Sequence, residues 1–573
     1  MKKNVIKKLV TASLVGALAI STLAGCGSKE DNSNTSTSTS TSTEELTSVE
    51  PVEIQEGSGI ESWKAFDSTV TIQIPVYDRG EDGDETNNYW TKWINDEFGS
   101  KYNVNVEFVA IGRGTVLDDY NNLGNAGKLP TILMEYDFDK CAYWANDGFL
   151  QELDLEAFAQ VAPTYYQMMV DNNYLQYTAL NGKTWFALAE RPYSDTNYTF
   201  VTFYRQDWLD QLGKSYPTNY AEWQALYAAI KEAGLAEYPA GGTKIANTAG
   251  IDQNYAYRTY PQDELTWATT GDYAIPALSS EAQKKLLKNR NSDYNNGYFN
   301  PEFATREAAD GEADFISGKA FSYSSYISPE LNVITDFYAQ NPDAKLAIAP
   351  VSTSTDDGNG AASCAYRVNN AYGMMVGFAS TATEDQVKAA QMYMEWLIQP
   401  ENLFTFQYGY EGKNHDVVDG VTTLRGADTM DAETLMVARQ NKDYFCVVIE
   451  ARKDATIEET VKKSYPSIYK DSDAFYDQIV ANYYLYKEVI EKTPMYAVTD
   501  CKFAATLEES ANLQTYLLDQ YSTYATQLTV CAPEEFDALY DELSAKYLED
   551  GYQKVIDERQ ALYEAGKTSS LPQ

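Results

Sequence analysis

The sequence around Cys26 is the clearest chemical motif in the chain. It ends the run Leu23-Ala24-Gly25-Cys26, preceded by four lysines and an apolar stretch that begins at Leu9. A basic start, a short apolar run and small residues before the cut indicate a secretory signal, and the run is too short to remain as a membrane span. In bacteria this pattern predicts cleavage before Cys26 and diacylglycerol on its sulfur. The alternative is an ordinary cleaved signal with an incidental cysteine.

The residues after Cys26 have the composition of a tether. Residues 27–43 are mostly Ser, Thr and Asn with almost nothing apolar, so they cannot bury enough surface to offset the ordering of the backbone. We therefore predict a lipoprotein signal peptide over residues 1–25 and a disordered tether over residues 26–60. The protein is expected at the outer face of the cell membrane, which it contacts through its N-terminal lipid only.

The net charge excludes some partners. The chain of 573 residues has a formal charge of −40, and removal of residues 1–25, which hold four lysines and no acidic residue, takes it to about −44. Such a charge argues against nucleic acid and against a polybasic membrane patch. It disfavours polyanionic substrates without selecting among neutral ones.

Cysteine and histidine are too few for most metal or triad chemistry. The sequence has six cysteines and a single histidine, His415. No Cys-x-x-Cys spacing occurs, so we predict no zinc site and no cofactor. A Cys501–Cys531 disulfide and buried thiols both remain open. The acidic loop at residues 78–85 lacks the spacing of a calcium-binding loop and is interpreted as solvated.

Two Tyr-Asp pairs stand at the ends of predicted strands. Strands are expected over residues 69–77, 104–109 and 131–134, with helices between them over residues 88–98 and 118–123. This alternation predicts a parallel sheet, and ligands of such sheets lie beyond the carboxyl ends of the strands. Tyr77 with Asp78, and Tyr136 with Asp137, occupy those ends and are predicted to contact a ligand.

The remainder of the chain continues the α/β pattern. Further strands are expected over residues 199–204, 320–323 and 374–378. Further helices are expected over residues 205–213, 220–233, 304–316 and 384–398, and the last hundred residues are mostly helical.

The order of several short motifs resembles that of a known family. The motifs are Gly127-Lys128-Leu129-Pro130-Thr131-Ile132, with Thr131 where Asp is usual, Tyr204-Arg205-Gln206-Asp207-Trp208-Leu209, Phe315-Ile316-Ser317-Gly318-Lys319-Ala320, Met394-Glu395-Trp396-Leu397 and Tyr408-Gly409-Tyr410-Glu411-Gly412. With the Cys26 motif, they resemble the family 1 extracellular solute-binding proteins of bacterial ABC transporters, especially long lipoproteins associated with carbohydrate uptake.

This resemblance implies a two-lobed α/β fold of the periplasmic-binding-protein type (type II), with a ligand cleft between the lobes and a helical C-terminal region. Lobe 1 would hold residues 61–190 and 372–470, and lobe 2 residues 191–371 and 471–573. A hinge would close the lobes over the ligand.

The resemblance also implies further ligand-binding residues. A sugar ring is held by a flat aromatic side chain against its C–H face and by polar groups at its hydroxyl rim. By their place in the family's fold, the further candidates are Trp90, Trp185, Arg191, Tyr193, Trp267, Tyr323, Tyr326, Tyr372 and Glu411. For each tryptophan, the alternative is a place in the hydrophobic core.

The expected function is therefore capture, without catalysis. The protein would bind an extracellular saccharide or another small solute and deliver it to an ABC transporter permease. The alternative is an extracellular lipoprotein glycosidase or polysaccharide lyase. A glycosidase needs two carboxylates at a set separation, and among 84 acidic residues such pairs occur by chance, so their abundance does not favour an enzyme.

The lipid anchor can be tested directly. Cys26→Ala removes the sulfur that would carry the lipid, so the variant should be released from the membrane or remain as an unprocessed precursor. Membrane fractionation and the mass of the mature N-terminus measure both outcomes. A variant that is matured and tethered like the wild type would rule out lipidation at Cys26.

Overall fold

The computed structural model describes most of the chain after the predicted tether. The described residues are 49–78, 84–113, 115–180, 182–190, 200–244, 264–270, 275–326, 332–350, 366–367, 372–418, 420–425, 429–435, 472–492, 497–498, 501–503, 505 and 507–569. Cys26 and the predicted signal peptide lie outside them.

The first pair of strands is parallel, as predicted. β1 (Val70–Asp78) and β2 (Val104–Gly112) pair in register from Val70 opposite Val104 to Asp78 opposite Gly112. In β1, Val70, Ile72 and Ile74 are buried and alternate with half-buried residues, which is the pattern of a strand that packs one face on a core.

The helix between these strands begins at a strong cap. The Asn88 side chain accepts hydrogen bonds from the backbone N–H groups of Trp90 and Thr91 and so starts α1 (Tyr89–Ile94). The helix continues through a π-helical turn, Asn95–Gly99, into α2 (Ser100–Tyr102), and it ends where Asn103 adopts a left-handed conformation. The predicted helix over residues 88–98 is confirmed.

The third predicted strand pairs differently from the prediction. β3 (Ile132–Glu135) lies in a sheet of order β3-β11-β6, where β11 (Tyr372–Phe378) is antiparallel to both β3 and β6 (Phe186–Glu190). The parallel sheet that we expected is confirmed for β1 and β2, whereas the strand that pairs with β3 is antiparallel to it. β11, a strand from much later in the chain, lies between β3 and β6. The order of neighbouring elements in the sequence cannot predict a pairing between strands so far apart.

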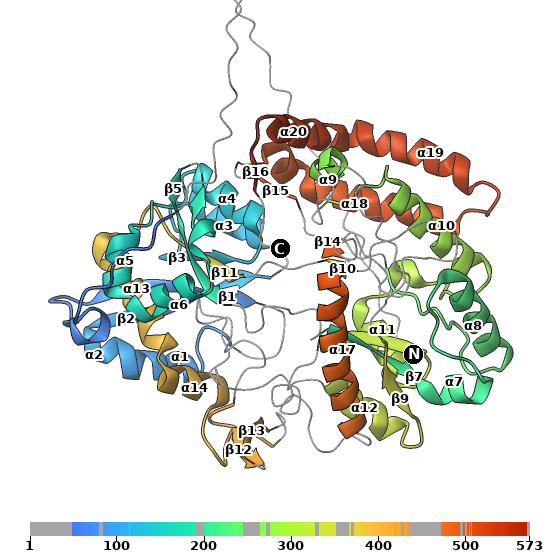
Figure 1. The fold of residues 1–573 in the computed structure, drawn as a ribbon, viewed down its shortest axis with the longest axis horizontal. Helices are drawn as coiled ribbons and strands as arrows, with labels where there is room; N and C mark the ends of the chain where they lie inside the picture. Colours follow the sequence, from blue (N-terminus) through green and yellow to red (C-terminus); the bar gives the residue numbers. More distant parts are fainter. Residues whose placement is uncertain are drawn as a thin grey trace, which may run out of the picture. The chain divides into compact units, whose positions relative to one another are not determined.

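One hydrophobic core surrounds these strands. Its buried residues come from Val70 to Ala189 and then from Tyr372 to Phe406. Helices α3 and α4 pack beside β2, β3 and β11, and α6 and α13 pack beside β6 and β1 (Figure 1). The bounds are α3 (Val116–Asn125), α4 (Phe138–Asn146), α5 (Leu155–Val161), α6 (Pro163–Asp171), α13 (Glu384–Ile398) and α14 (Pro400–Tyr408).

The segment before β1 is fastened to this core. Val52 N–H donates to the Tyr166 hydroxyl at 2.8 Å, Gln160 Nε2 donates to Glu53 O at 2.9 Å, and Trp63 Nε1 donates to Val161 O at 3.2 Å. We had assigned residues 49–60 to the tether. Here these residues pack on α5 and α6, because the sparse apolar side chains Val49, Val52 and Ile54 find partly buried places on the core.

The middle of the chain builds a separate antiparallel sheet. β7 (Phe200–Arg205) pairs with β8 (Ser322–Tyr326) on one side and β9 (Leu346–Ile348) on the other. Two clusters of buried residues flank it, drawn from residues 201–348 and from α17 (Ser472–Lys492). The helices of this part are α7 (Gln206–Leu212), α8 (Tyr220–Glu232), α10 (Glu281–Asn295), α11 (Ala308–Ile316) and α12 (Asn332–Gln340).

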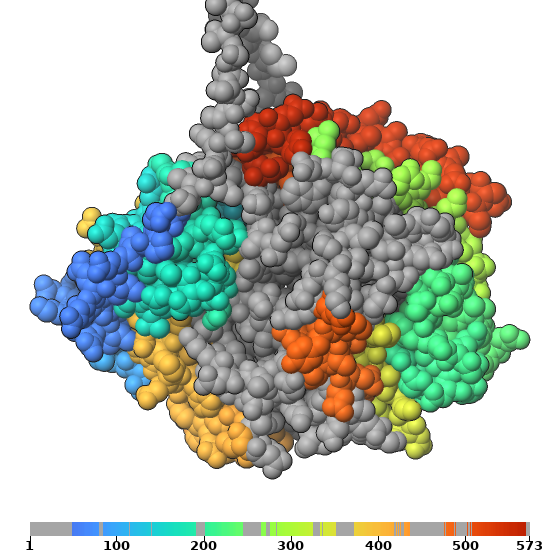
Figure 2. Space-filling view, viewed as in Figure 1, coloured from blue at the N-terminus to red at the C-terminus, as the bar shows by residue number. Residues whose placement is uncertain are grey.

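The end of the chain is helical, as predicted. α18 (Glu508–Val530), α19 (Phe536–Tyr547) and α20 (Gln553–Glu564) share a core with α10. In Figure 2, α17 (orange) and the C-terminal helices (red) form surface, and Tyr484 on α17 is 53% exposed. Cys501 and Cys531 are both thiols and belong to different clusters, so the open question of a disulfide is answered against it.

The remaining elements are short. They are 3-10 turns at Gly59–Glu61, Leu175–Tyr177 and Phe303–Thr305, a π turn at Leu548–Tyr552, the helix α9 (Glu264–Thr270), and the strands β4 (Ala179–Leu180), β5 (Lys183–Thr184), β10 (Tyr366–Arg367), β12 (His415–Val418), β13 (Val421–Leu424), β14 (Ala497–Val498), β15 (Lys502–Phe503) and β16 (Thr568–Ser569). Within the described residues, no helix has the length and apolarity needed to cross a lipid bilayer.

A buried carboxylate joins two helices of the first core. The Glu395 side chain on α13 accepts hydrogen bonds from the backbone N–H groups of Thr164, at 3.2 Å, and Tyr165, at 3.0 Å. These N–H groups belong to the first turn of α6, where no intrahelical acceptor is available. Burial raises the pKa of Glu395, and the hydrogen bonds it accepts oppose that shift.

The raised pKa makes a testable difference to stability. The folded protein holds the Glu395 proton to a higher pH than the unfolded chain, whose glutamates titrate near pH ~4.3. The stabilisation from this group is therefore complete below that pH and is lost as pH rises through the folded pKa. Glu395→Gln does not titrate, so the free energy of unfolding of the wild type relative to this variant should fall as pH rises from about 4.3 through the folded pKa.

Urea unfolding at several pH values measures this difference. Glu401→Gln, at an exposed position of α14, controls for the general effect of removing an acid. A wild-type advantage over Glu395→Gln that grows with pH would mean that the pKa is lowered in the folded state.

Candidate functional site

Four strands of the first core end at one edge of their sheets. β1 and β2 are parallel, and β3 and β6 share a direction because both are antiparallel to β11. β1 and β3 also share a direction, since Gln73 N–H donates to Thr131 Oγ1 at 2.9 Å and Tyr77, four residues on, donates to Met134 O at 3.3 Å. We call this edge, which holds Asp78, Arg113, Glu135, Tyr136, Asp137 and Glu190, the carboxyl edge.

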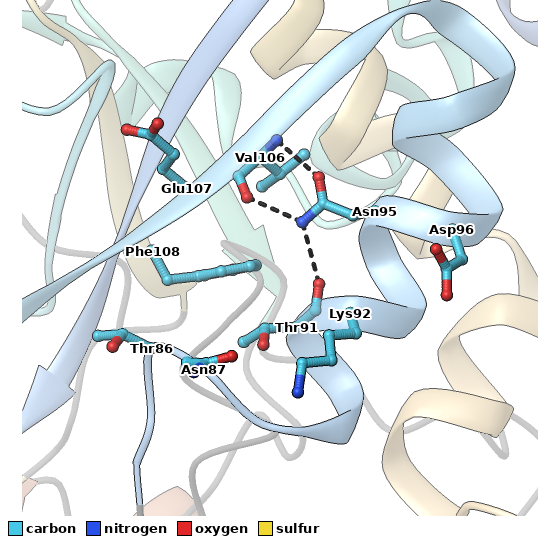
Figure 3. A pocket seen from close by; sticks show the side chains of 9 residues that line it. All are labelled: Thr86, Asn87, Thr91, Lys92, Asn95, Asp96, Val106, Glu107 and Phe108. Carbon is cyan, nitrogen blue, oxygen red and sulfur yellow. Dashed lines mark hydrogen bonds between the residues drawn. The ribbon is translucent and has the colours of Figure 1, made fainter.

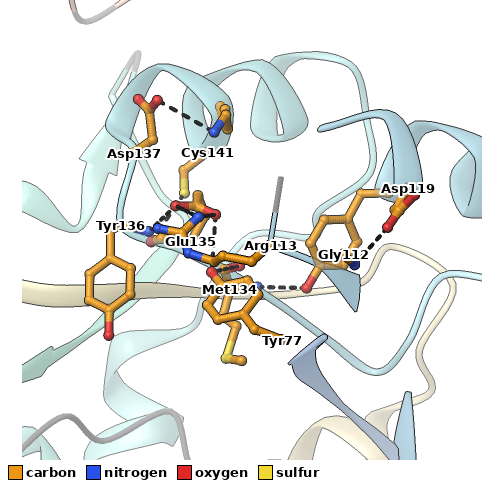
Figure 4. Close-up of polar contacts among 11 residues, drawn as sticks. Tyr77, Gly112, Arg113, Asp119, Met134, Glu135, Tyr136, Asp137 and Cys141 are labelled. Carbon is orange, nitrogen blue, oxygen red and sulfur yellow. Dashed lines mark hydrogen bonds and ion pairs between the residues drawn. The ribbon is translucent and has the colours of Figure 1, made fainter. Parts of the chain in front are cut away.

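An ion pair occupies the centre of the carboxyl edge. Arg113, directly after β2, places Nη1 3.3 Å from Glu135 Oε2, at the end of β3 (Figure 4). The Arg113 side chain is 37% exposed and that of Glu135 only 2%. The pair therefore has a buried anion and a cation that reaches the surface.

The buried carboxylate is held by three groups. Besides Arg113, the Tyr77 hydroxyl donates to Glu135 Oε2 at 3.0 Å and Tyr136 N–H donates to Oε1 at 2.9 Å (Figure 4). Tyr77 is itself fully buried, and burial raises the pKa of Tyr77 well above its ordinary value, with the Glu135 carboxylate adding to the shift. Tyr77 is therefore neutral and acts as a donor that orients Glu135.

The other predicted residues of this edge reach the surface. Tyr136 is half-buried, and its ring centroid lies 5.9 Å from the Arg113 guanidinium. Asp137 is also half-buried and lies 3.7 Å from Lys140 Nζ, one turn along α4. Asp78 is exposed, and its carbonyl accepts from Arg113 N–H at 2.9 Å. The structure thus brings both predicted Tyr-Asp pairs to one place.

The predicted Trp90 lies in an aromatic cluster beside α1. It is fully buried and stacks on Tyr410, with ring centroids 5.9 Å apart. Its Nε1 has no hydrogen-bond partner among the described residues. The half-buried Tyr89 bonds the Tyr410 hydroxyl at 3.0 Å, so these two rings cover Trp90. Glu411, next in the chain, is exposed in a tight turn.

Trp185 and Tyr372 lie at opposite ends of β6, since Trp185 precedes its first residue and Tyr372 pairs with its last, Glu190. Trp185 is half-buried, and its Nε1 donates to Leu180 O at 3.1 Å. Tyr372 is fully buried at the start of β11, with its ring 5.2 Å from that of Tyr177. The burial of Tyr372 places it in the core of this sheet.

Of the candidates that follow the first sheet in the chain, Tyr323 packs against a different core. Tyr323 on β8 is half-buried, stacks on Phe315, and donates to Glu312 Oε2 at 2.6 Å. Tyr326 ends β8 opposite Phe200, and Trp267 lies in α9; for both, the structure describes the backbone. Arg191 and Tyr193 lie outside the described residues. As a set, these site residues remain predictions.

Arg113 is the residue that the sequence analysis missed. We ended the second strand at residue 109, but β2 continues to Gly112, so Arg113 is the first residue beyond its carboxyl end. The alternating Val-x-Val-x-Phe pattern runs into Ala110 and Ile111, and the buried Ile111 was the signal of a longer strand. Glu135 was placed at a strand end without being recognised as a ligand or positioning residue.

A surface hollow of about 480 Å³ lies elsewhere, between α1 and the outer edge of β2 (Figure 3). Its lining residues are Thr86, Asn87, Thr91, Lys92, Asn95, Asp96, Val106, Glu107 and Phe108. The Asn95 amide occupies this edge, since it accepts from Val106 N–H and donates to Val106 O, each at 2.9 Å. No predicted site residue lines the hollow. We favour the carboxyl edge, because ligands of such sheets bind at strand ends.

The described residues offer no cluster for a metal ion. Nowhere among them do three or more His, Cys, Asp or Glu side chains come together as ligands. Asp84, at the end of the predicted acidic loop, accepts hydrogen bonds from the Thr86 hydroxyl and from Asn87 N–H. The Thr86 hydroxyl is the main reason that the pKa of Asp84 is lowered, and Asp84 acts as a turn residue.

Comparison with protein families gives one match. The family described as bacterial extracellular solute-binding protein matches residues 82–403, more than half of the chain. No curated protein sequence matches.

Comparison with solved structures gives the same fold class. The alginate-binding protein AlgQ2 without calcium ion matches with a TM-score of 0.60 at 15% identity, over 87% of this chain and 99% of that one. A solute-binding protein associated with an ABC transporter that binds human milk oligosaccharides, from Bifidobacterium longum infantis, matches at 0.56 and 16%, over 87% and 100%. The Streptococcus pneumoniae protein FusA in complex with kestose matches at 0.56 and 12%, over 86% and 99%. The predicted α/β fold of the periplasmic-binding-protein type is confirmed.

Proposed function

Because the chain belongs to the family of bacterial extracellular solute-binding proteins, we propose that it captures an extracellular oligosaccharide and delivers it to the permease of an ABC transporter. The family is non-catalytic, so the expectation that the chain is no enzyme is confirmed, and the alternative of a glycosidase or lyase loses its basis. The earlier resemblance to this family is likewise confirmed.

The carboxyl edge is the observation that carries the saccharide proposal. It presents a half-buried aromatic ring, Tyr136, beside a guanidinium, Arg113, and two carboxylates, Asp78 and Asp137. A ring that can stack on a C–H face, next to groups that bond hydroxyls, is the combination that a sugar requires. Proteins of similar fold whose ligands are alginate, milk oligosaccharides and kestose support the same class of ligand.

Ligand capture would use two lobes. The first core takes its residues from β1 to β6 and again from β11 onward, whereas the clusters around β7 use the chain between these stretches together with α17. The chain thus passes three times between separately packed bodies, which supports a hinge, and a ligand that binds only the closed form shifts the equilibrium toward it. We also propose that a lipid on Cys26 anchors the protein to the membrane.

The proposed site can be tested by removing its side chains one at a time. Tyr136→Ala, Tyr323→Ala and Tyr326→Ala each remove a ring that we expect to stack on the sugar, at a cost of about 1–3 kcal/mol by analogy with stacked bases. That corresponds to roughly 5- to 150-fold in affinity. Asp137→Ala should cost a comparable amount, since sugar hydroxyls lose their acceptor.

Calorimetry with the saccharide that a thermal-shift screen selects measures these affinities. Tyr516→Ala, on the exposed face of α18, serves as the matched control, because its side chain is 46% exposed and far along the chain from the strand ends. If all four site variants bind as tightly as this control, the site lies elsewhere, and Trp185 and Trp267 become the next candidates.

A further prediction concerns the hinge. Saturation with the selected saccharide should lower the radius of gyration in small-angle scattering, because the ligand holds the lobes closed. A saccharide that thermal shift does not select provides the control. An unchanged radius at full occupancy would argue for a rigid site.

A further inference from the structure

We infer that Glu135 sets the charge selectivity of the carboxyl edge: by neutralising Arg113, it directs the site to uncharged oligosaccharides and against those that contain uronic acids. This inference rests on the proposed function and narrows its ligand class. It starts from the ion pair at the centre of the edge, where a buried carboxylate meets a cation that reaches the surface.

Arg113 is the charge that an acidic sugar would need. An arginine beside aromatic rings is well suited to a carboxylate, because its planar fork can bond both oxygens at once. Its guanidinium carbon lies 4.8 Å from the Tyr77 ring centroid and 5.9 Å from that of Tyr136. The two rings therefore fix the place of the cation at the edge.

The buried Glu135 carboxylate already neutralises the positive charge of Arg113. Its carboxylate lies against Arg113 Nη1 and has almost no contact with water. Tyr77 and Tyr136 N–H hold both carboxylate oxygens, so Glu135 cannot turn away when a ligand arrives. An incoming carboxylate would meet a neutral pair instead of a free cation.

The other described charges of the edge are mostly negative. Asp78 ends β1, Glu190 ends β6, and Asp137 is balanced by Lys140 at 3.7 Å. With the Arg113–Glu135 pair neutral, an anionic ligand would face carboxylates, and like charges at close range are unfavourable. The chain's overall charge of −40 acts in the same direction. A neutral sugar meets no such penalty and can use the same oxygens as hydrogen-bond acceptors.

Competition between neutral and acidic glycans tests the inference. The purified protein is mixed with equal amounts of neutral oligosaccharides and oligouronides matched in chain length. Gel filtration separates the bound fraction, and mass spectrometry identifies its sugars. The wild type should retain neutral oligosaccharides, with oligouronides below about a tenth of the bound pool. Retention of oligouronides would overturn the inference while upholding the proposed function, and retention of neither class would overturn both.

Two variants locate the selectivity in the ion pair. Glu135→Gln keeps the shape of the side chain and removes the negative charge opposite Arg113, so the ratio of bound oligouronide to bound neutral oligosaccharide should rise about tenfold. The double variant Arg113→Gln/Glu135→Gln removes both charges and should return the share to the wild-type level. Thermal melting checks that each variant is folded.

A folded Glu135→Gln protein with the wild-type preference would overturn the role of Glu135. If Glu135→Gln does not fold, Arg113→Gln decides the matter, because it makes the edge more negative. That variant should lower the oligouronide share further, and a rise would contradict the inference.

Discussion

The carboxylate of Glu135 is buried, and the geometry of the carboxyl edge depends on how its charge is satisfied. Removing an ion from water is costly unless hydrogen bonds and a counter-charge replace its hydration. Here the replacements come from the ends of three strands: the Tyr77 hydroxyl from β1, the Arg113 guanidinium after β2, and the Tyr136 N–H after β3. One buried charge thus ties together three segments that are far apart in sequence. Because these segments are held in place, the surface that they form has a fixed geometry.

The same principle recurs where helices meet. Glu395 on α13 satisfies the first N–H groups of α6, and the segment from Val49 to Trp63 bonds α5 and α6 through Gln160 and Tyr166. These contacts hold the outer helices to the first core by polar groups and apolar burial together. They also fix where the chain joins the core after the predicted tether, at α5 and α6. The N-terminal segment therefore packs on the first core, which also carries the carboxyl edge.

The structure shows where part of the chain's excess negative charge lies. A formal charge of −40 spread over the sequence excludes polyanionic partners only in general terms. Among the residues that the structure describes at the carboxyl edge, several carboxylates lie around the Arg113 guanidinium, which is paired with Glu135. A binding protein for hydroxyl-rich ligands needs acceptors more than it needs net charge. Carboxylates supply acceptors, and in our proposal the buried Glu135 prevents the Arg113 guanidinium from selecting an anion.

The sequence by itself determined the elements and the family. Periodicity gave the strands of residues 69–77 and 131–134 and the capped helix after Asn88, because local patterns of burial and capping are written in neighbouring residues. The order of short motifs indicated the solute-binding family. The Tyr-Asp pairs were found because strand ends can be located from the chain alone.

Only the tertiary structure decided which strands pair and what the strand ends do. β11 inserts antiparallel between β3 and β6 from nearly two hundred residues away, and no local pattern records that register. Burial then separated residues of the same type. Tyr77 became an internal donor to Glu135 while Tyr136 reached the surface, although each stands beside an aspartate at a strand end. Which of two tyrosines in similar sequence positions reaches the surface depends on the side chains packed around it, and those come from elsewhere in the fold.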